Sequence, residues 1–344
     1  MNAAPIEGAW LDAFGDVLQR CGVRRGDACA VLAESQSRAV LPELAMLALH
    51  RLGATAFLAR VPTPPPSGGP PVRSTGASTA LQGQGALTEA LARSTLVVDC
   101  TVEGLQHAAE LPVVLAGGAR VLVVSNEHPE ILLRCLPQEG DEAQAREAMR
   151  ALRGARRMHV HSAAGTDLRV DLAGARVGGV WGFTRRPGSL THWPGGLVLA
   201  FPAAGSVNGS LVLDRGDVNL TFKRYLADAV RLQIADDHVV EVVGDSPDAE
   251  MLRRCYADWG DASARAVSHV GWGLNRRARW DAMTYYDKAD FNGTELRAFA
   301  GNFLYSTGAN EVASRHTAGH FDLPLRGCTI ELDGSVVVRE GVLL

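Results

Sequence analysis

The order of expected strands and helices predicts an α/β protein, in which a parallel α/β domain is followed by a mixed α+β domain. Over residues 1–125, apolar runs typical of buried strands alternate with helical segments, which is the pattern of a parallel sheet covered by helices. From about Met158 the pattern changes to short strands separated by turns. The 344 residues exceed one typical domain, so we expect domains at 1–125 and 158–344, joined by a connecting segment at 126–157.

The first domain is predicted from the regular succession of its elements. Residues 9–21 carry Trp10, Phe14 and Leu18 near helical spacing and are expected to form an amphipathic helix. A second helix is expected at 38–51, and strands are expected at 27–32, 54–61, 96–99 and 119–124. Since no G-x-G-x-x-G motif follows the first strand, the sequence does not indicate a dinucleotide site.

Residues 62–85 break this succession with a long segment rich in Pro, Gly, Ser and Thr, including three consecutive prolines at 64–66. A loop of this length inside a compact domain is either functional or disordered. Two interpretations therefore stay open. The segment is a lid or subunit contact over a site, or it is a mobile surface insert.

In the second half of the chain, a connecting helix is expected at 141–153. The strands expected beyond it lie at 158–162, 197–201, 209–213, 230–234 and 239–243, and further helices are expected at 248–259 and 276–283. Asp333-Gly334 is typical of a hairpin turn between strands at 329–331 and 336–338.

Composition excludes several classes of function. The net charge of -4 comes from mixed signs without a basic stripe, which argues against a nucleic-acid partner. The six cysteines are scattered without a C-x-x-C motif, so we expect reduced thiols in a cytoplasmic protein. Neither a signal peptide nor an uncharged run long enough for a membrane span is evident.

The stretch from Ala318 to Gly327 is expected to be a short strand that carries chemistry. His320 and Asp322 lie two residues apart, so both side chains project from the same face. Together they make two-thirds of a 2-His-1-carboxylate iron site. His159 and His161 share this spacing, but the sequence shows no third ligand for them, and we interpret them as ordinary polar residues.

Four blocks of the second domain resemble the 2,5-dihydroxypyridine 5,6-dioxygenases, which share their fold with the M29 (aminopeptidase T-like) metallopeptidases. The blocks are Thr191–Gly196, Ser268–Asn275, Gly301–Gly308 and His320–Gly327, and their order and spacing extend the resemblance over nearly the whole chain. The resemblance implies a metal-binding catalytic domain with Fe(II) held by His269, His320 and Asp322. An Asp oxygen and His nitrogens suit Fe(II) better than Cu(I) or Ca²⁺.

The sequence differs from the peptidases at positions where those enzymes bind their metal ions. His269 stands where those two-metal enzymes have a metal-binding Glu, and Leu304 stands where they have a His. The block at 191–196 lacks their acidic pair. The groups that remain suit one metal ion with positions open for substrate and O2.

His192 is the candidate catalytic residue. One alternative is a loop histidine bonded to backbone, and the other is a general base that takes the proton of a substrate hydroxyl. The resembled dioxygenases carry a His in this block, which favours the base. Candidate substrate contacts are Ser306, Tyr305 and Thr307, which can bond substrate or cap a strand, and Trp193, which can stack on a ring or pack in the core.

Val180, Arg185 and Arg186 depart from the resembled family, whose members are more acidic in this segment. A basic pair beside a pocket can accept a carboxylate on the substrate, or it can be solvated. The role of His107 is left open, because the spacing around it does not align cleanly with the family.

The resemblance implies a mononuclear non-haem Fe(II) dioxygenase, of extradiol type, that cleaves 2,5-dihydroxypyridine to N-formylmaleamate with O2 and without an organic cofactor. A homo-oligomer is expected. The alternatives are an M29-type metallo-aminopeptidase, a dioxygenase of a carboxylated hydroxypyridine, and a non-catalytic binding protein on an inherited fold.

Overall fold

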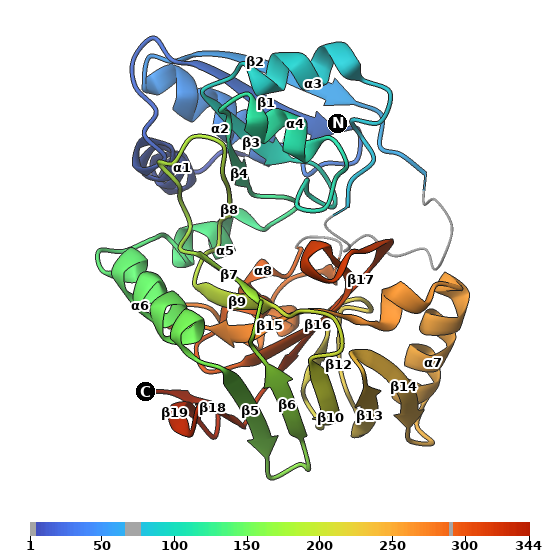
Figure 1. Cartoon of the computed structure of the whole chain (residues 1–344). Helices are drawn as coiled ribbons and strands as arrows, with labels where there is room; N and C mark the ends of the chain where they lie inside the picture. Colours follow the sequence, from blue (N-terminus) through green and yellow to red (C-terminus); the bar gives the residue numbers. More distant parts are fainter. Residues whose placement is uncertain (1–4, 66–76, 289–291) are drawn as a thin grey trace.

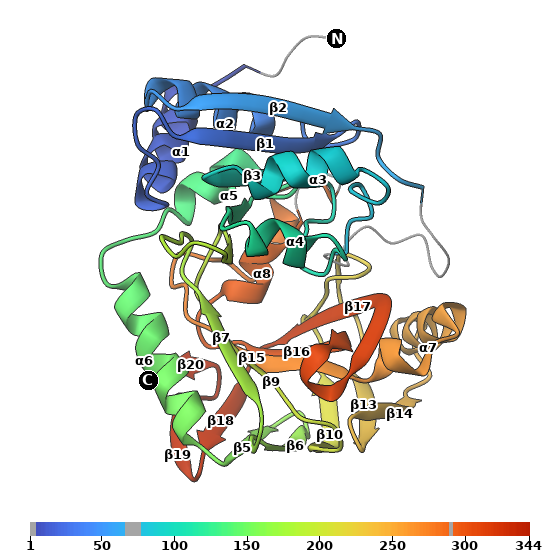
Figure 2. The ribbon, with the colours of Figure 1, turned by 45° about the horizontal axis from the view of Figure 1, so that its top comes forward.

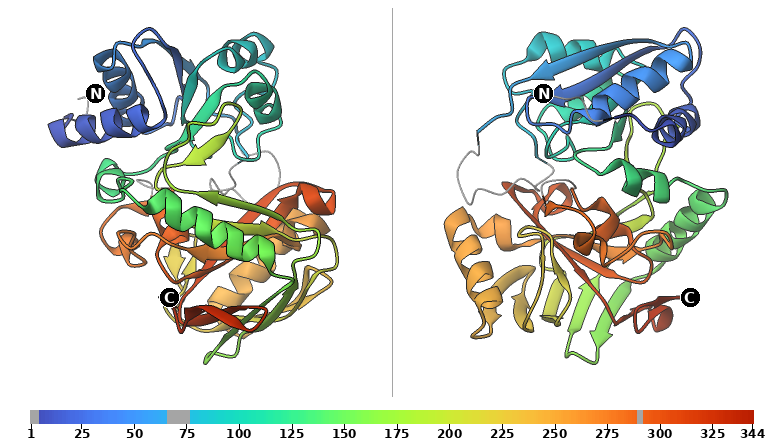
Figure 3. Two further views of the ribbon diagram at one scale, coloured as in Figure 1. Left: turned by 60° about the vertical axis from the view of Figure 1, so that its left-hand side comes forward. Right: turned by 180° about the vertical axis from the view of Figure 1, so that it is seen from behind.

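The computed structural model describes residues 5–65, 77–288 and 292–344, and it confirms the predicted α/β fold. Two bodies are stacked, one built on a parallel sheet near the N-terminus and one built on two antiparallel sheets near the C-terminus (Figure 1). Figure 3 shows the same stacking from the side and from behind. The described helices include none that is long and apolar enough to cross a membrane.

The first body is a five-stranded parallel sheet with helices on both faces. Its order is β2-β1-β3-β4-β8, with β1 (Ala28–Glu34), β2 (Thr55–Val61), β3 (Leu96–Cys100), β4 (Arg120–Val123) and β8 (Leu190–His192). One face packs on α1 (Gly8–Arg20) and α2 (Val40–Arg51), and the other on α3 (Gly85–Ala92) and α4 (Leu111–Ala116). Because both faces are buried, the central strands are mostly apolar, with Asp99 of β3 as a buried exception.

The fifth strand of this sheet comes from far along the chain. β8 pairs in parallel with β4 and sets His192 beside Val123. Residues outside 1–125 therefore complete the first sheet, and the domain boundaries at 125 and 157 stay predictions. As a consequence, His192 stands at the carboxyl edge of a parallel sheet, which is where α/β proteins place their ligand sites.

The second body consists of two antiparallel sheets that share one core. The larger sheet has the order β14-β13-β10-β6-β5-β18-β19-β20, and the smaller has the order β17-β16-β15-β9-β7. In chain order the strands are β5 (Arg157–Ser162), β6 (Asp167–Asp171), β7 (Arg176–Val180), β9 (Leu197–Phe201), β10 (Val207–Leu213), β13 (Val230–Ala235), β14 (His238–Val243), β15 (Val267–Gly273), β16 (Phe303–Asn310), β17 (Arg315–Leu325), β18 (Cys328–Leu332), β19 (Ser335–Arg339) and β20 (Val342–Leu343). The smaller sheet lies between the larger sheet and the first body (Figure 2).

The remaining elements connect or flank these sheets. They are α5 (Pro129–Arg134), α6 (Asp141–Gly154), α7 (Pro247–Trp259), α8 (Thr294–Ala298), the short 3-10 helices η1 (Ala262–Arg265), η2 (Ala282–Thr284) and η4 (Glu311–Ala313), and the two-residue strands β11 (Val218–Asn219) and β12 (Arg224–Tyr225). The predicted hairpin at Asp333-Gly334 is confirmed. Both turn residues have positive φ, 49° and 86°, as a two-residue turn between twisted strands requires.

The helix predicted at 276–283 is wrong, because only η2 at its end is helical. The backbone N–H of Arg279 donates to the buried Glu295 carboxylate at 2.7 Å, in place of a carbonyl one turn earlier. A tertiary contact therefore overrides local helix propensity here.

The long loop predicted at 62–85 lies partly outside the described residues, at 66–76. Its described ends are held at the end of β1. Thr63 bonds Ser35 at 3.2 Å between hydroxyls, and the Ser78 hydroxyl donates to Glu34 at 2.8 Å.

Candidate active site

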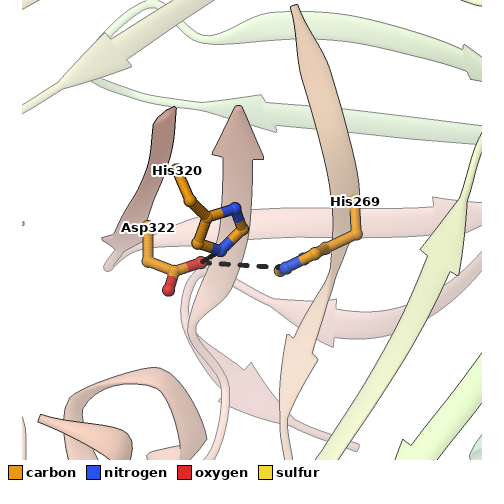
Figure 4. A group of neighbouring side chains, drawn as sticks. All are labelled: His269, His320 and Asp322. Atoms are coloured by element: carbon orange, nitrogen blue, oxygen red, sulfur yellow. Dashed lines mark ion pairs between the residues drawn. The ribbon is translucent and has the colours of Figure 1, made fainter. Parts of the chain in front are cut away.

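Cross-strand pairing brings three side chains into one row on the smaller sheet. β15 sets His269 opposite Ser306, and β17 sets Asp322 opposite the same Ser306. His320 precedes Asp322 by two residues and therefore points to the same face. Figure 4 shows His269, His320 and Asp322 turned toward one another.

The geometry of these three residues fits one metal ion. The Nε2 atoms of His269 and His320 lie 3.8 and 3.4 Å from Oδ1 of Asp322. One ligand atom from each residue lies within 4.8 Å of the other two, and all three residues are buried. Ligands that bind one ion at about 2.0–2.2 Å lie roughly 3.0–3.6 Å apart, so small adjustments would complete the site.

The Asp322 carboxylate is held on both of its oxygens. Oδ1 accepts a hydrogen bond from the Ser306 hydroxyl, and Oδ2 accepts one from Nε of Arg297 on α8 at 2.5 Å. Burial alone would raise the pKa of this carboxyl, but the Arg297 guanidinium and the His320 imidazole outweigh it and hold the pKa well below its usual range. Asp322 therefore stays ionised and can supply the negative charge that a bound cation would require.

Gly308 makes room for His320 on the neighbouring strand. The two residues are paired across β16 and β17, and Gly308 has a φ of 126°. A Cβ at this position would lie 2.3 Å from the carbonyl oxygen of Gly319 and 3.2 Å from Nδ1 of His320. Any larger residue would displace the β17 backbone, and the His320 imidazole with it.

A cavity of about 470 Å³ opens beside the triad at the junction of the two bodies. The first body contributes residues from the loop after β3 and from α4 and β8, among them Gln106, His107 and His192. The second body contributes an apolar wall formed by Val180, Leu197, Leu199, Phe201 and Leu304. Apolar walls with a few convergent polar groups are typical of a small-molecule site.

Three histidines around the cavity, His107, His192 and His269, are neutral at physiological pH. Burial lowers the pKa of His269 to about 3 and that of His192 to about 4, and it holds the pKa of His107 well below its usual range. Nε2 of His192 lies 2.9 Å from the amide oxygen of Gln106. Because that oxygen can only accept, the proton of His192 resides on Nε2, and Nδ1 is the basic nitrogen.

The mouth of the cavity carries an ion pair. Nη1 of Arg176, on β7, lies 3.1 Å from Oε2 of Glu311 on η4. The same guanidinium lies 5.0 Å from the centre of the Phe201 ring, and that ring meets His269 edge to face at 5.4 Å. A chain of contacts therefore runs from the solvent-exposed rim to a candidate metal ligand.

The structure places the four predicted substrate contacts outside the cavity. Ser306 lies behind Asp322 and holds it, whereas Tyr305 and Thr307 project to the opposite face of β16, into the core. None of the three lines the cavity. Trp193 is also outside the cavity, since it is fully buried in the core of the first body, 5.1 Å from the ring of Phe14. The geometry therefore does not support direct substrate contacts for these four residues.

The basic pair of the sequence also lies elsewhere. Arg185 and Arg186 are exposed and do not line the cavity, and Nε of Arg185 donates to the carbonyl of Arg20 at 3.1 Å. Of the two alternatives for these arginines, this position favours solvated surface charge over contact with a substrate carboxylate. Val180, from the same segment, does line the cavity.

Sequence reasoning missed Arg297 and Gln106 and left His107 open. Arg297 lies on a five-residue helix, and the other two lie in the irregular segment between β3 and α4. The ring of His107 is centred 4.9 Å from that of His320, although more than two hundred residues separate them. Such residues have no periodic signal, because tertiary packing alone brings them to the triad. For Gln106 and His107 this packing is between the two bodies.

Comparisons with known proteins agree with this architecture. A family model described as 2,5-dihydroxypyridine 5,6-dioxygenase (NicX) matches residues 9–344. A protein of Pseudomonas putida with that same name is 37% identical over 342 residues, which cover 98% of this chain and 97% of the relative. The solved structure of 2,5-dihydroxypyridine dioxygenase from P. putida KT2440 matches with a TM-score of 0.92 at 35% identity, covering 99% of this chain and 98% of that one.

A more distant structure shares the fold alone. Wild-type AmpT from Thermus thermophilus matches with a TM-score of 0.64 at 17% identity, covering 97% of this chain and 99% of that one. The expected likeness to the aminopeptidase T fold is therefore confirmed. At this identity it carries no statement about activity.

Proposed function

Because the chain belongs to the 2,5-dihydroxypyridine 5,6-dioxygenase family and is therefore a ring-cleaving dioxygenase, we propose that it opens 2,5-dihydroxypyridine at one Fe(II) held by His269, His320 and Asp322. The observation that carries this proposal is the convergence of two imidazoles and one carboxylate beside a cavity. This donor set is the facial triad of non-haem Fe(II) oxygenases. When bound, Fe(II) would supply the electron transfer that lets O2 react with an electron-rich ring.

His192 acts as the general base in this proposal. Its Nδ1 is unprotonated at neutral pH, because burial lowers the pKa to about 4 and Gln106 fixes the proton on Nε2. Removing the proton of a substrate hydroxyl makes the ring more electron-rich and therefore more reactive toward O2. Arg297 and Ser306 keep Asp322 oriented during the reaction.

The proposed reaction breaks the ring bond between C5 and C6 and places one atom of O2 on each of these carbons. The product is N-formylmaleamate, which contains all atoms of the ring and both oxygen atoms. The apolar wall formed by Val180, Leu197, Leu199, Phe201 and Leu304 can lie against the ring face and exclude water from the reacting bond.

The test is an anaerobic purification with iron analysis, followed by oxygen uptake with 2,5-dihydroxypyridine. We expect about one iron per chain and a product that carries two labelled atoms from ¹⁸O2. His320→Ala should lose iron and ring cleavage, whereas His316→Ala, which changes an exposed residue of the same strand, should keep both. Full iron occupancy in His320→Ala would remove this residue from the metal site.

The aminopeptidase alternative needs a second metal next to the first. Within the described residues, the three-ligand group found is His269, His320 and Asp322, and Leu304 lines the cavity beside it. Hydrolysis of an amino-acid amide by the two-metal protein, without oxygen uptake, would support this alternative.

We further propose that the protein acts in the cytoplasm as a homo-oligomer. All six cysteines are free and buried, as expected of structural thiols in a reducing compartment. Gel filtration with light scattering measures the oligomeric state, and a purely monomeric protein would contradict the second part of this proposal.

A further inference from the structure

Two histidines on the outer face of the larger sheet have a carboxylate neighbour in the structure that the sequence does not reveal. His159 and His161 lie two apart on β5, and the residues that alternate with them are buried in the core. β18 pairs with one side of β5 and sets Glu331 opposite His159. β6 pairs with the other side and sets Asp167 opposite His161. Figure 1 shows β6, β5 and β18 at the end of the second body away from the first.

The Glu331 carboxylate lies between the two imidazoles. Its Oε1 is 3.5 Å from Nε2 of His161, and its Oε2 is 4.0 Å from Nδ1 of His159. The two rings are centred 5.2 Å apart and tilted by 36°. The two nitrogens therefore face opposite oxygens of one carboxylate. The His161 distance falls within the roughly 3.0–3.6 Å that separates ligands of a single ion, and the His159 distance is wider, so the side chains would have to move closer to bind one ion.

The hydrogen bond between Asp167 and His159 fixes which ring nitrogen of His159 carries the proton. Its Oδ1 lies 2.8 Å from Nε2 of His159 and can only accept, so the proton of this imidazole is on Nε2. The lone pair of His159 is then on Nδ1, the nitrogen nearest Glu331. Histidines that bind metals commonly donate their other N–H to a carboxylate in this way, which fixes the ring and raises its basicity.

We propose that His159, His161 and Glu331 form a peripheral site for a divalent transition-metal ion such as Zn²⁺, with Asp167 as a positioning residue. Imidazole nitrogens combined with a carboxylate suit this class of ion. The group is wider than the internal triad. The His161 imidazole is 44% exposed and can rotate to close on an ion, while Asp167 holds the His159 imidazole and the strands fix the Cα positions.

This site is separate from the ring-cleavage site. None of its four residues lines the catalytic cavity, and they belong to the larger sheet, whereas the internal triad belongs to the smaller one. The inference therefore does not depend on the proposed function. It has a practical consequence, because a metal content above one per chain would otherwise be mistaken for a two-metal centre of the aminopeptidase type.

The experiment is anaerobic equilibrium dialysis of the iron-loaded protein against Zn²⁺ alone, with iron and zinc counted together. We expect one zinc per chain in addition to retained iron in the parent and in His50→Asn, which changes an exposed histidine of the first body. His161→Asn and Glu331→Gln should each lose that zinc while keeping iron and oxygen uptake. Asp167→Asn should weaken zinc binding by about 10–100-fold.

Two results would contradict the proposed zinc site. The first is a parent that retains iron and takes up no zinc. The second is zinc uptake that is equal in the parent, His161→Asn and Glu331→Gln, because the ion would then be bound elsewhere. Circular dichroism of each variant shows that the sheet is intact, so a loss of zinc is attributable to the missing ligand.

Discussion

Each carboxylate oxygen of Asp322 has its own partner, and this decides how the residue can bind an ion. The Arg297 guanidinium binds Oδ2, so only Oδ1 faces the two imidazoles. In the proposed metal site, Asp322 would therefore bind through one oxygen, which would leave room at the metal for substrate and O2. The backbone carbonyl of Arg297 is itself held by the Asn302 amide at 2.7 Å.

Replacing Arg297 by Met tests this arrangement. The variant frees Oδ2 and removes the charge that keeps Asp322 ionised, so we expect iron affinity to fall by about 10–100-fold. Arg297→Lys keeps a positive charge without the planar fork and should fall between the parent and Arg297→Met. The measurement is a competition of each protein against a chelator. Equal iron affinity in all three proteins would show that Arg297 does not act through Asp322.

Replacing His192 by Gln separates proton transfer from metal binding. We expect iron to be retained and kcat to fall by about 10²–10⁴-fold, because a general base typically contributes this much. Rapid-quench turnover and iron analysis on the same sample provide the two readings. If iron were lost in proportion to activity, His192 would be a ligand and the assignment of a base would fail.

Secondary structure could largely be predicted from the sequence where a strand or helix packs one face against a single hydrophobic core. The alternation in β17 correctly placed His320 and Asp322 on one face, and buried apolar runs located β1 to β4 within one or two residues. Prediction failed where distant groups intervene, as at Arg279 and Glu295. It also failed for substrate contacts, because strand alternation alone does not tell which face of β16 meets the cavity.

The Arg176–Glu311 pair at the cavity mouth is expected to influence substrate choice. Glu311 neutralises the guanidinium nearest the entrance, so it disfavours rings that carry a carboxylate. Glu311→Gln should raise kcat/KM for a carboxylated dihydroxypyridine about two- to fivefold relative to the plain ring, as expected for one exposed charge interaction. Arg176→Met serves as the matched variant and should lower that ratio. A ratio that neither substitution changes would leave this pair as surface charge.

At the scale of the whole molecule, the site exists only where the two bodies meet, so contacts between them are part of its structure. Arg134 of α5 binds the buried Glu295 of α8 at 2.6 Å. The backbone N–H of Thr294 donates to the Glu127 carboxylate at 2.7 Å. Both contacts anchor the N-terminal turn of α8, the helix that carries Arg297. The sequence could not indicate this junction, since its parts are separated by well over a hundred residues.

The stability of the whole fold should depend on pH through Asp217. This buried carboxylate accepts hydrogen bonds from the backbone of Asp214 at 2.8 Å and of Arg326 at 3.0 Å, and so ties the turn before β11 to the end of β17. Burial raises its pKa to about 6, from an ordinary value near 3.9 in the unfolded chain. Between these values the folded protein binds the proton more tightly than the unfolded chain does. The free energy of unfolding therefore falls as pH rises from about 4 to 6.

Urea unfolding of the parent and of Asp217→Asn at pH 4.5 and 7.5 measures this dependence. Asparagine cannot titrate, so the variant should gain about 2 kcal/mol relative to the parent between the two pH values, and any pH dependence of the metal centre cancels in the difference. Asp281→Asn is a control for which the opposite sign is expected. Hydrogen bonding to Arg279 lowers the pKa of Asp281, so the folded state is stabilised when this carboxylate is ionised. The free energy of unfolding of the parent should therefore fall relative to that of Asp281→Asn as pH falls. If the difference between the parent and Asp217→Asn were the same at both pH values, Asp217 would titrate alike in the folded and unfolded chains, and burial at this turn would impose no cost on its charge.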